Sequence, residues 1–131
     1  MTRRVALAVS FSVLVSSVSL LAHHSAASAY DVDKKITLRG TVTKLEWQNP
    51  HVFYYLDVTD PGGKVTNWSI EASTPNQLYR NGWRKDDLKI GEVVTVTSSS
   101  PARNGLPKAY GGTLTLADGR KVFSGSAATD Q

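Results

Sequence analysis

The sequence predicts a mainly β protein: a small five-stranded barrel with one short helix, behind an N-terminal leader. Two patterns predict the barrel, because apolar and polar residues alternate in short runs after Tyr30 and turn-forming residues separate these runs. The third observation is composition: 131 residues, 40% of them hydrophobic and 20% charged, suit a single globular domain. The chain has no Cys, which excludes disulfide scaffolds, thiolate metal sites and cysteine nucleophiles.

Residues 1–22 are expected to be a signal peptide. Arg3 and Arg4 form a short positive start, and an uncharged, mostly apolar run follows to Ala22. Serines dilute this run, which favours a cleaved signal over a permanent membrane anchor and predicts a periplasmic or secreted protein. Without Arg3 and Arg4, the 15 Lys and Arg residues become 13 against 11 Asp and Glu, so the formal net charge falls from +4 to +2. Such a small, scattered charge argues against nucleic acid as a partner.

The signal cleavage site decides how the mature protein begins. Small residues permit cleavage after any of three alanines: Ala22, Ala27 or Ala29. Only cleavage after Ala22 leaves His23 at the new N-terminus and keeps His24 in the mature chain. The residues alone leave these alternatives open.

The first three strands are expected before residue 73. In the first strand, four inward positions alternate with polar residues: Ile36, Leu38, Gly40 and Val42. The apolar positions then shift to Leu45 and Trp47, and a β-bulge at 43–44 would explain this shift by re-aiming the side chains. The next elements are, in order, a strand at 52–58, a turn at 60–63 and a strand at 65–72.

A short helix should follow the third strand. Ser73 or Thr74 can cap a helix that begins at Pro75 and ends before Gly82, and Trp83 is expected to plug one end of the barrel. The remaining expected elements are, in order, a turn at 86–88, a strand at 91–98, a loop at 98–107, a strand at 108–116, a turn at 118–119 and a short strand at 121–123.

Three strands, a helix and then two or three strands follow the order of an OB-fold, the five-stranded Greek-key barrel. Lipocalin-like and SH3-like barrels are the main alternatives. The chain is expected to divide into a signal peptide at 1–22, an N-terminal segment at 23–34, an OB-like barrel domain at 35–124 and a disordered tail at 125–131.

The histidines are candidate metal ligands. If cleavage follows Ala22, His23 offers an α-amine and an imidazole to one ion, and His24 and His51 can complete the set. Imidazole and amine nitrogens suit Cu(II), so copper is the expected metal if one binds. In the alternative interpretation, His23 and His24 belong to the leader or a loose tail, and His51 caps a turn.

A second candidate site is the bend between the first two strands. Pro50 forces Asn49 out of the helical region, so the chain from Trp47 to His51 must turn there. In an OB-fold this connection lies near the ligand-binding face. We therefore expect Trp47 and Asn49 to contact a ligand.

The aromatic residues of the second strand extend this candidate site. Phe53 and Tyr55 share the face opposite to Tyr54, so they form an exposed stacking platform or are covered by another segment. Glu71 faces away from the core side of its own strand and is expected to point outward or into a groove.

Several short motifs together resemble a known family. They are His23-His24-Ser25, Tyr30-Asp31, Trp47-Gln48-Asn49-Pro50-His51, Asn67-Trp68, Gly82-Trp83 and 118–123. With them the chain resembles, over about residues 22–125, the exported bacterial proteins of domain of unknown function family 6152. It departs from that pattern at 26–29, where the family has an aromatic and then an acidic residue. The resemblance implies cleavage after Ala22 and convergence of His23, His24 and His51, and it implies no activity.

These observations lead to one main expectation and two alternatives. The main expectation is a non-enzymatic, exported β-barrel that binds a small ligand, with copper at His23, His24 and His51 as its narrowest form. The first alternative is a structural or interaction module of the cell envelope that docks a protein or glycan by its aromatic face. The second is a copper-dependent oxidase that uses the same nitrogens.

Overall fold

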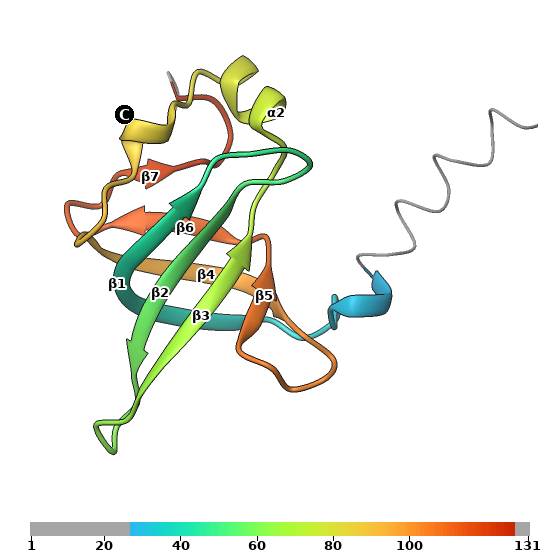
Figure 1. Cartoon of the computed structure of the whole chain (residues 1–131), viewed down its shortest axis with the longest axis vertical. Helices are drawn as coiled ribbons and strands as arrows, with labels where there is room; N and C mark the ends of the chain where they lie inside the picture. Colours follow the sequence, from blue (N-terminus) through green and yellow to red (C-terminus); the bar gives the residue numbers. More distant parts are fainter. Residues whose placement is uncertain (1–26, 128–131) are drawn as a thin grey trace, which may run out of the picture.

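The computed structural model describes residues 27–127, which form a mainly β structure (Figure 1). Within this range lie seven strands of one sheet: β1 Ile36–Glu46, β2 Phe53–Thr59, β3 Val65–Glu71, β4 Val93–Pro101, β5 Lys108–Tyr110, β6 Thr113–Leu116 and β7 Lys121–Val122. Two short helices, α2 Pro75–Arg80 and a 3₁₀ helix at Lys85–Asp87, connect β3 to β4. None of the helices in this range is long and apolar enough to cross a membrane.

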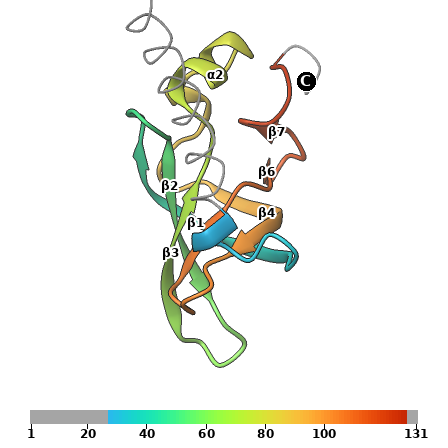
Figure 2. The same ribbon diagram turned by 90° about the vertical axis from the view of Figure 1, so that its right-hand side faces the viewer.

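Five of the strands close a barrel in the order β1-β2-β3-β5-β4, because β4 also pairs with β1. The β3–β5 pair is parallel and the other four pairs of the barrel are antiparallel. This topology confirms the predicted OB-like fold, with β6 and β7 added outside the barrel along β4. In Figure 2, β2 and β3 lie on one side of the molecule and β4, β6 and β7 on the other.

Strand β1 closes the barrel because it bends from one layer into the other. Residues 36–41 pair with β4, and residues 41–46 pair with β2. Gly40 lies just before the change of partner, where a Cβ atom would come within 2.5 Å of the Asp57 carbonyl oxygen. The register then shifts between Val42 and Lys44, which confirms the predicted bulge.

The inward faces of both layers form one core. Its fully buried members include Leu56, Ile70, Val94, Val96 and Leu114. Trp83 is buried in the same core, in agreement with its predicted role as a plug, and its Nε1 donates to the carbonyl oxygen of Ser124 at 3.2 Å. The amide of Ala127 donates to the Asn81 carbonyl, so the described part of the C-terminal segment lies against the end of α2.

Local signals set the connections largely as expected. The Thr74 side chain caps α2 by accepting from the amide of Gln77, and Pro75 occupies the first turn. The predicted turn near Asp87 is the 3₁₀ helix, which the Asp87 carboxylate stabilises by accepting from the amide of Arg84. The β2–β3 turn is held by the Asp60 side chain, which accepts from the amide of Lys64.

Two expectations for the second half of the chain are wrong. Strand β4 continues through Pro101, where a loop was expected, and the strand expected at 108–116 is two strands, β5 and β6. The reason is a change of partner: β4 pairs with β6 at 94–97 and with β5 at 100–101. The φ angle is positive at Ser98 (58°), Gly111 (65°) and Gly112 (97°). These residues bend β4 and the connection between β5 and β6 at this point.

We call this point, where β4 leaves β6 and pairs with β5, the fork. Buried Ser99 stabilises it. Its hydroxyl lies 3.2 Å from the Tyr110 carbonyl oxygen and 2.9 Å from the Gly111 carbonyl oxygen. Both carbonyls lie where the chain leaves β5, so the hydroxyl replaces ladder hydrogen bonds that end there. A run of serines has no apolar alternation, which is why the sequence pattern predicted a loop.

Candidate ligand-binding site

The fork leaves a cavity of about 250 Å³ at one end of the barrel. Strand β5 pairs with β3 only as far as Glu71, and Gly111 and Gly112 then turn the chain away into β6. The end of β3 and the following residues therefore face β6 and β7 across a gap in the ladder. The cavity is lined by His51, Tyr54, 71–74, 110–112, Leu114, Val122 and Phe123.

His51 and Glu71 meet at the mouth of this cavity. His51 lies two residues before the start of β2 and Glu71 ends β3, and these two strands remain paired one step further through Val52 and Ala72. The His51 Nδ1 lies 2.8 Å from the Glu71 Oε1. When the imidazole is neutral and donates from Nδ1 to this carboxylate, the other ring nitrogen, Nε2, carries the lone pair.

Tyr30 holds the second oxygen of Glu71. Its hydroxyl donates to the Glu71 Oε2 at 2.8 Å, and its ring stacks on that of Tyr110 with centroids 5.5 Å apart. Burial, the hydrogen bond to Glu71 and the negative charge of that carboxylate raise the pKa of Tyr30 well above its usual range. Tyr30 therefore stays a donor at neutral pH, and Glu71 has a fixed partner on each oxygen.

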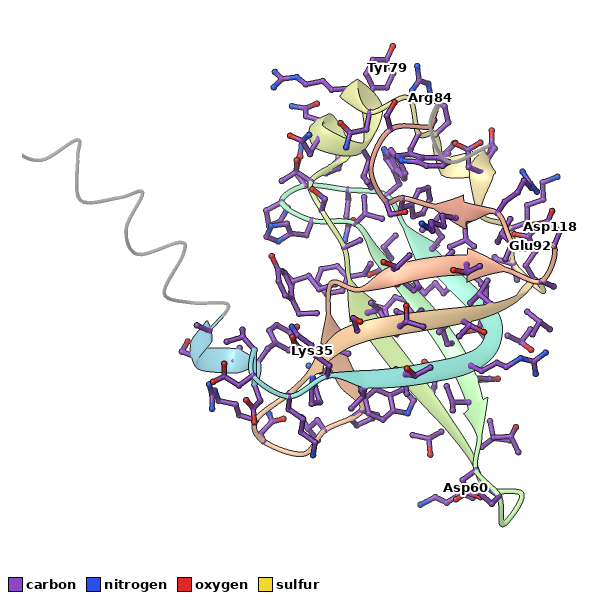
Figure 3. All side chains as sticks on the ribbon, turned by 180° about the vertical axis from the view of Figure 1, so that it is seen from behind. Lys35, Asp60, Tyr79, Arg84, Glu92 and Asp118 are labelled. Carbon is purple, nitrogen blue, oxygen red and sulfur yellow. The ribbon has the colours of Figure 1, made fainter. Side chains whose placement is uncertain are left out.

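The N-terminal segment is attached beside the same site. Tyr30 forms an isolated antiparallel bridge with Ala102, and the amide of Asp31 donates to the Pro101 carbonyl at 2.9 Å. The side chain of Lys35 adds a hydrogen bond to the Ser100 hydroxyl at 2.9 Å (Figure 3). These contacts attach residues 30–35 to residues 100–102, beside the Glu71 carboxylate that Tyr30 contacts.

Tyr54 contributes a further polar group to the cavity. The residue is only 2% exposed, and its hydroxyl has no hydrogen-bond partner within residues 27–127. No fully buried polar side-chain atom of this range lacks a partner, so the Tyr54 hydroxyl is open to the cavity that its residue lines. Burial raises the pKa of Tyr54 far above that of a free tyrosine, so the hydroxyl is neutral and can donate.

The rest of the lining is partly apolar and partly polar. Its apolar part consists of the rings of Tyr54, Tyr110 and Phe123 and the side chains of Ala72, Leu114 and Val122, and Ser73 and Thr74 add hydroxyl groups. The ring of Phe123 is in turn held edge-on by Trp47 and Trp83, at centroid distances of 5.5 and 6.3 Å. An apolar cavity with a few convergent polar groups is the usual form of a small-molecule site.

A second depression lies on the outer face of the barrel. This outer groove, about 460 Å³ in volume, is lined by Tyr30, Glu46, Gln48, Phe53, Tyr55, Asn67, Ser69 and 106–108. The Tyr55 hydroxyl donates to the Glu46 Oε2 at 2.8 Å, and Lys44 pairs with the same carboxylate and lies over the Tyr55 ring. Phe53 and Tyr55 are each partly exposed here.

The residues expected to bind a ligand are divided between these places. Glu71 and His51 lie together at the cavity, whereas Phe53 and Tyr55 line the outer groove. Trp47 supports the cavity wall from behind through Phe123. Asn49 is exposed in the bend and lines neither the cavity nor the outer groove.

The predicted copper ligands are only partly described. His23 and His24 lie outside the described residues, as do the signal peptide and its cleavage after Ala22. Between residues 27 and 127, no group of three or more His, Cys, Asp or Glu side chains is placed to hold a metal ion. His51 is thus the one predicted ligand whose position is on view.

Two residues of the site were not singled out as ligand contacts from the sequence. Tyr30, which donates to Glu71, was not placed at a site, and Tyr54 was assigned to the core face of its strand. A tyrosine on a core-facing position is the signal that could have identified Tyr54, because its hydroxyl needs a polar neighbour or an opening. Gly111 and Gly112 carried a second signal, since paired glycines inside a strand indicate a break.

The family comparison agrees with the motifs. A family model described as "Family of unknown function (DUF6152)" matches residues 10–111, which include His51, Tyr54 and Glu71. No curated protein matches the chain.

Proposed function

The chain belongs to DUF6152, a family of unknown function, and we propose from its own residues that it is an exported, non-enzymatic protein that binds a small ligand in the cavity beside His51. One observation carries the proposal: an imidazole is held by a carboxylate at a cavity whose walls include several apolar and aromatic side chains. A preorganised polar group beside apolar walls gives a ligand both affinity and orientation.

The contacts of Glu71 make it a positioning group for His51. One of its oxygens faces the His51 ring and the other accepts from Tyr30, so the carboxylate is committed to positioning. His51 then presents one nitrogen, Nε2, to a ligand. An imidazole whose other nitrogen is held by a carboxylate is well suited to accept a hydrogen bond or to ligate a metal.

Export rests on the sequence of residues 1–22. Their positive start and apolar run support a periplasmic or secreted protein, and the family resemblance implies cleavage after Ala22. Mass spectrometry of the protein purified from the periplasm of a bacterial host should give a chain that starts at His23. A mass that retains residues 1–22 contradicts export by a cleaved signal.

Copper is the narrowest form of the proposal. His51 would supply Nε2, and His23 and His24 would supply the other nitrogens. Cu(II) titration of the mature protein, followed by electron paramagnetic resonance, should then show a nitrogen-rich signal that His51→Ala alters and Asn49→Ala leaves unchanged. An identical spectrum in His51→Ala would show that copper does not bind in the cavity.

A panel of one-ring compounds tests the general proposal. Phenol, benzoate and benzylamine differ in charge but share a ring that the cavity can hold. In ¹⁵N–¹H NMR spectra, at least one should shift the amides of Ala72, Leu114 and Val122 in a saturable way. Ala72→Leu, which adds a side chain to the cavity wall, should abolish these shifts. If none of the three compounds shifts them, the cavity is not a ligand site.

The outer groove supports a second candidate function, docking of a glycan. Phe53 and Tyr55 present partly exposed rings next to the amides of Gln48 and Asn67, and rings with amides are suited to sugar faces and hydroxyls. Titration with the disaccharide N,N′-diacetylchitobiose should shift groove amides in the native protein but not in Phe53→Ser or Tyr55→Ser. Tyr79→Ser is the control, because Tyr79 is exposed on α2 (Figure 3). Shifts that persist in both groove variants contradict this role.

A further inference from the structure

We infer that the cavity takes a neutral aromatic molecule that carries a hydroxyl group, held between the hydroxyl of Tyr54 and the Nε2 of His51. This inference rests on the proposed function and names the ligand class of the same site. It follows from three properties of the cavity: its unpartnered hydroxyl, its charge and its walls.

The first property is the hydroxyl of Tyr54. It opens into the cavity from a residue that is 2% exposed, and no side chain or backbone group of residues 27–127 is bonded to it. A hydroxyl in that setting gains a partner when a ligand brings an oxygen. Tyr54 donates, and the Nε2 of His51 accepts because Nδ1 faces Glu71. A ligand hydroxyl can accept from the first and donate to the second.

The second property is charge. No Lys or Arg belongs to the cavity lining that the structure describes, and Glu71 is its one carboxylate. An anionic ligand would meet the carboxylate of Glu71 with no lysine or arginine in the lining to offset its charge. A cationic ligand would have to share Glu71 with His51 and Tyr30, each of which already contacts one of its oxygens. Because burying an unpaired charge is costly, the cavity favours a neutral molecule.

The third property is the shape and size of the walls. The rings of Tyr54, Tyr110 and Phe123, with Leu114 and Val122, line a space of about 250 Å³. An apolar cavity of roughly 150 Å³ is enough for benzene. The larger space here fits a substituted ring or two fused rings, with edge or offset stacking against the aromatic walls. The smallest molecule that meets all three properties is a phenol, and 2-naphthol fills more of the space.

Three matched probes separate these properties: 2-naphthol, naphthalene and 2-naphthoate, which share two fused rings and differ in the hydroxyl and the charge. In NMR titrations near pH 7 that follow Ala72, Leu114 and Val122, 2-naphthol should bind at least tenfold more tightly than 2-naphthoate. Tyr54→Phe should weaken 2-naphthol by roughly three- to tenfold, as expected for one lost hydrogen bond, and leave naphthalene unchanged. Tyr79→Phe, which removes an exposed hydroxyl, should change neither.

The outcomes distinguish this inference from the proposed function. Tighter binding of 2-naphthoate, or of benzylamine from the panel above, overturns the neutral class but leaves the cavity a ligand site. Equal affinity of native protein and Tyr54→Phe for 2-naphthol overturns the role of the hydroxyl. Absence of any shift with all probes overturns both the inference and the proposed function. Tyr54→Phe removes a hydroxyl that has no hydrogen-bond partner among residues 27–127, so a native-like NMR spectrum is expected. Ala72→Leu provides an independent test by blocking the cavity.

Discussion

The Nδ1 of His51 lies 2.8 Å from the Oε1 of Glu71, across the point where β2 and β3 end. This contact joins the bend that follows β1 to the strand that borders the fork. It also decides which nitrogen of the imidazole is free, and so determines what the cavity can offer to a ligand.

Removing the carboxylate should release the imidazole. In the native protein the contact with Glu71 favours the neutral tautomer that carries its proton on Nδ1. In Glu71→Ala we expect the Nε2–H tautomer to become the major form, since the Nδ1 acceptor is gone. Long-range ¹H–¹⁵N NMR correlations report the tautomer, and the signal is assigned by its loss in His51→Ala. Glu46→Ala is the control, because Glu46 pairs with Lys44 and Tyr55 instead. An unchanged tautomer in Glu71→Ala contradicts the assigned role.

Tyr30 should stabilise the fold through Glu71. Tyr30→Phe removes one hydrogen bond to a charged, half-buried carboxylate but keeps the stacked ring, so we expect the free energy of unfolding to fall by about 1–2 kcal/mol. The matched variant Tyr55→Phe removes the bond to the more exposed Glu46 and should cost less. Urea unfolding followed by Trp fluorescence measures both variants. Equal losses of stability in the two variants would show that the Tyr30 hydrogen bond stabilises the fold no more than the Tyr55 hydrogen bond does.

Alkaline pH should destabilise the protein through its two buried tyrosines. The pKa values of Tyr54 and Tyr30 are raised in the folded state, mainly by burial, so folding favours the protonated form of each. Their contribution is fully present below the unfolded pKa of about 10 and is lost as the pH rises above it, because the unfolded chain releases these protons first. Urea unfolding between about pH 8 and 11 should show this decline. It should be shallower in Tyr54→Phe and unchanged in Tyr79→Phe, and equal slopes in all three proteins would contradict it.

Gly112 should be the most sensitive glycine of the fork. A Cβ there would lie 2.6 Å from the Thr97 carbonyl oxygen and 3.1 Å from the Ser99 amide nitrogen, at a φ of 97°. We expect Gly112→Ala to lower the free energy of unfolding by roughly 3 kcal/mol or more, from a clash added to backbone strain.

Gly63 provides the control for this variant. Its φ is 86° but nothing lies within 4 Å of a Cβ there, so Gly63→Ala should cost only about 1 kcal/mol from the left-handed backbone. Urea titrations of the two variants measure the difference. Equal losses in the free energy of unfolding would mean that the structure around Gly112 adjusts to the added Cβ atom at no cost.

Much of the barrel could be predicted because its signals are local. Alternation placed β1 to β3, the shift of parity before Leu45 located the bulge, and Thr74 with Pro75 located the helix start. Each of these depends on residues within a few positions of one another. The fork at Ser98 escaped this reasoning, since it depends on which strand β4 meets beyond that residue.

The candidate site was predictable only in part for the same reason. Glu71 and His51 were singled out from the sequence, but as members of different sets, because alternation says which face a side chain takes and not which side chain it meets. Tyr30 reaches Glu71 across 41 positions of the chain. Contacts of that kind depend on barrel closure, which pairs strands that are distant in sequence.

The sequence by itself determined the mainly β class, the order of strands and helix and the family membership of this protein. The tertiary structure alone decided where β4 exchanges one partner for another, and hence that a cavity opens between β3 and β6. It also decided that the hydroxyl of Tyr54 faces that cavity and that His51 is held there by Glu71. The physical reason is that strand periodicity and turn chemistry are local, whereas a cavity is formed by the packing of segments far apart in the chain.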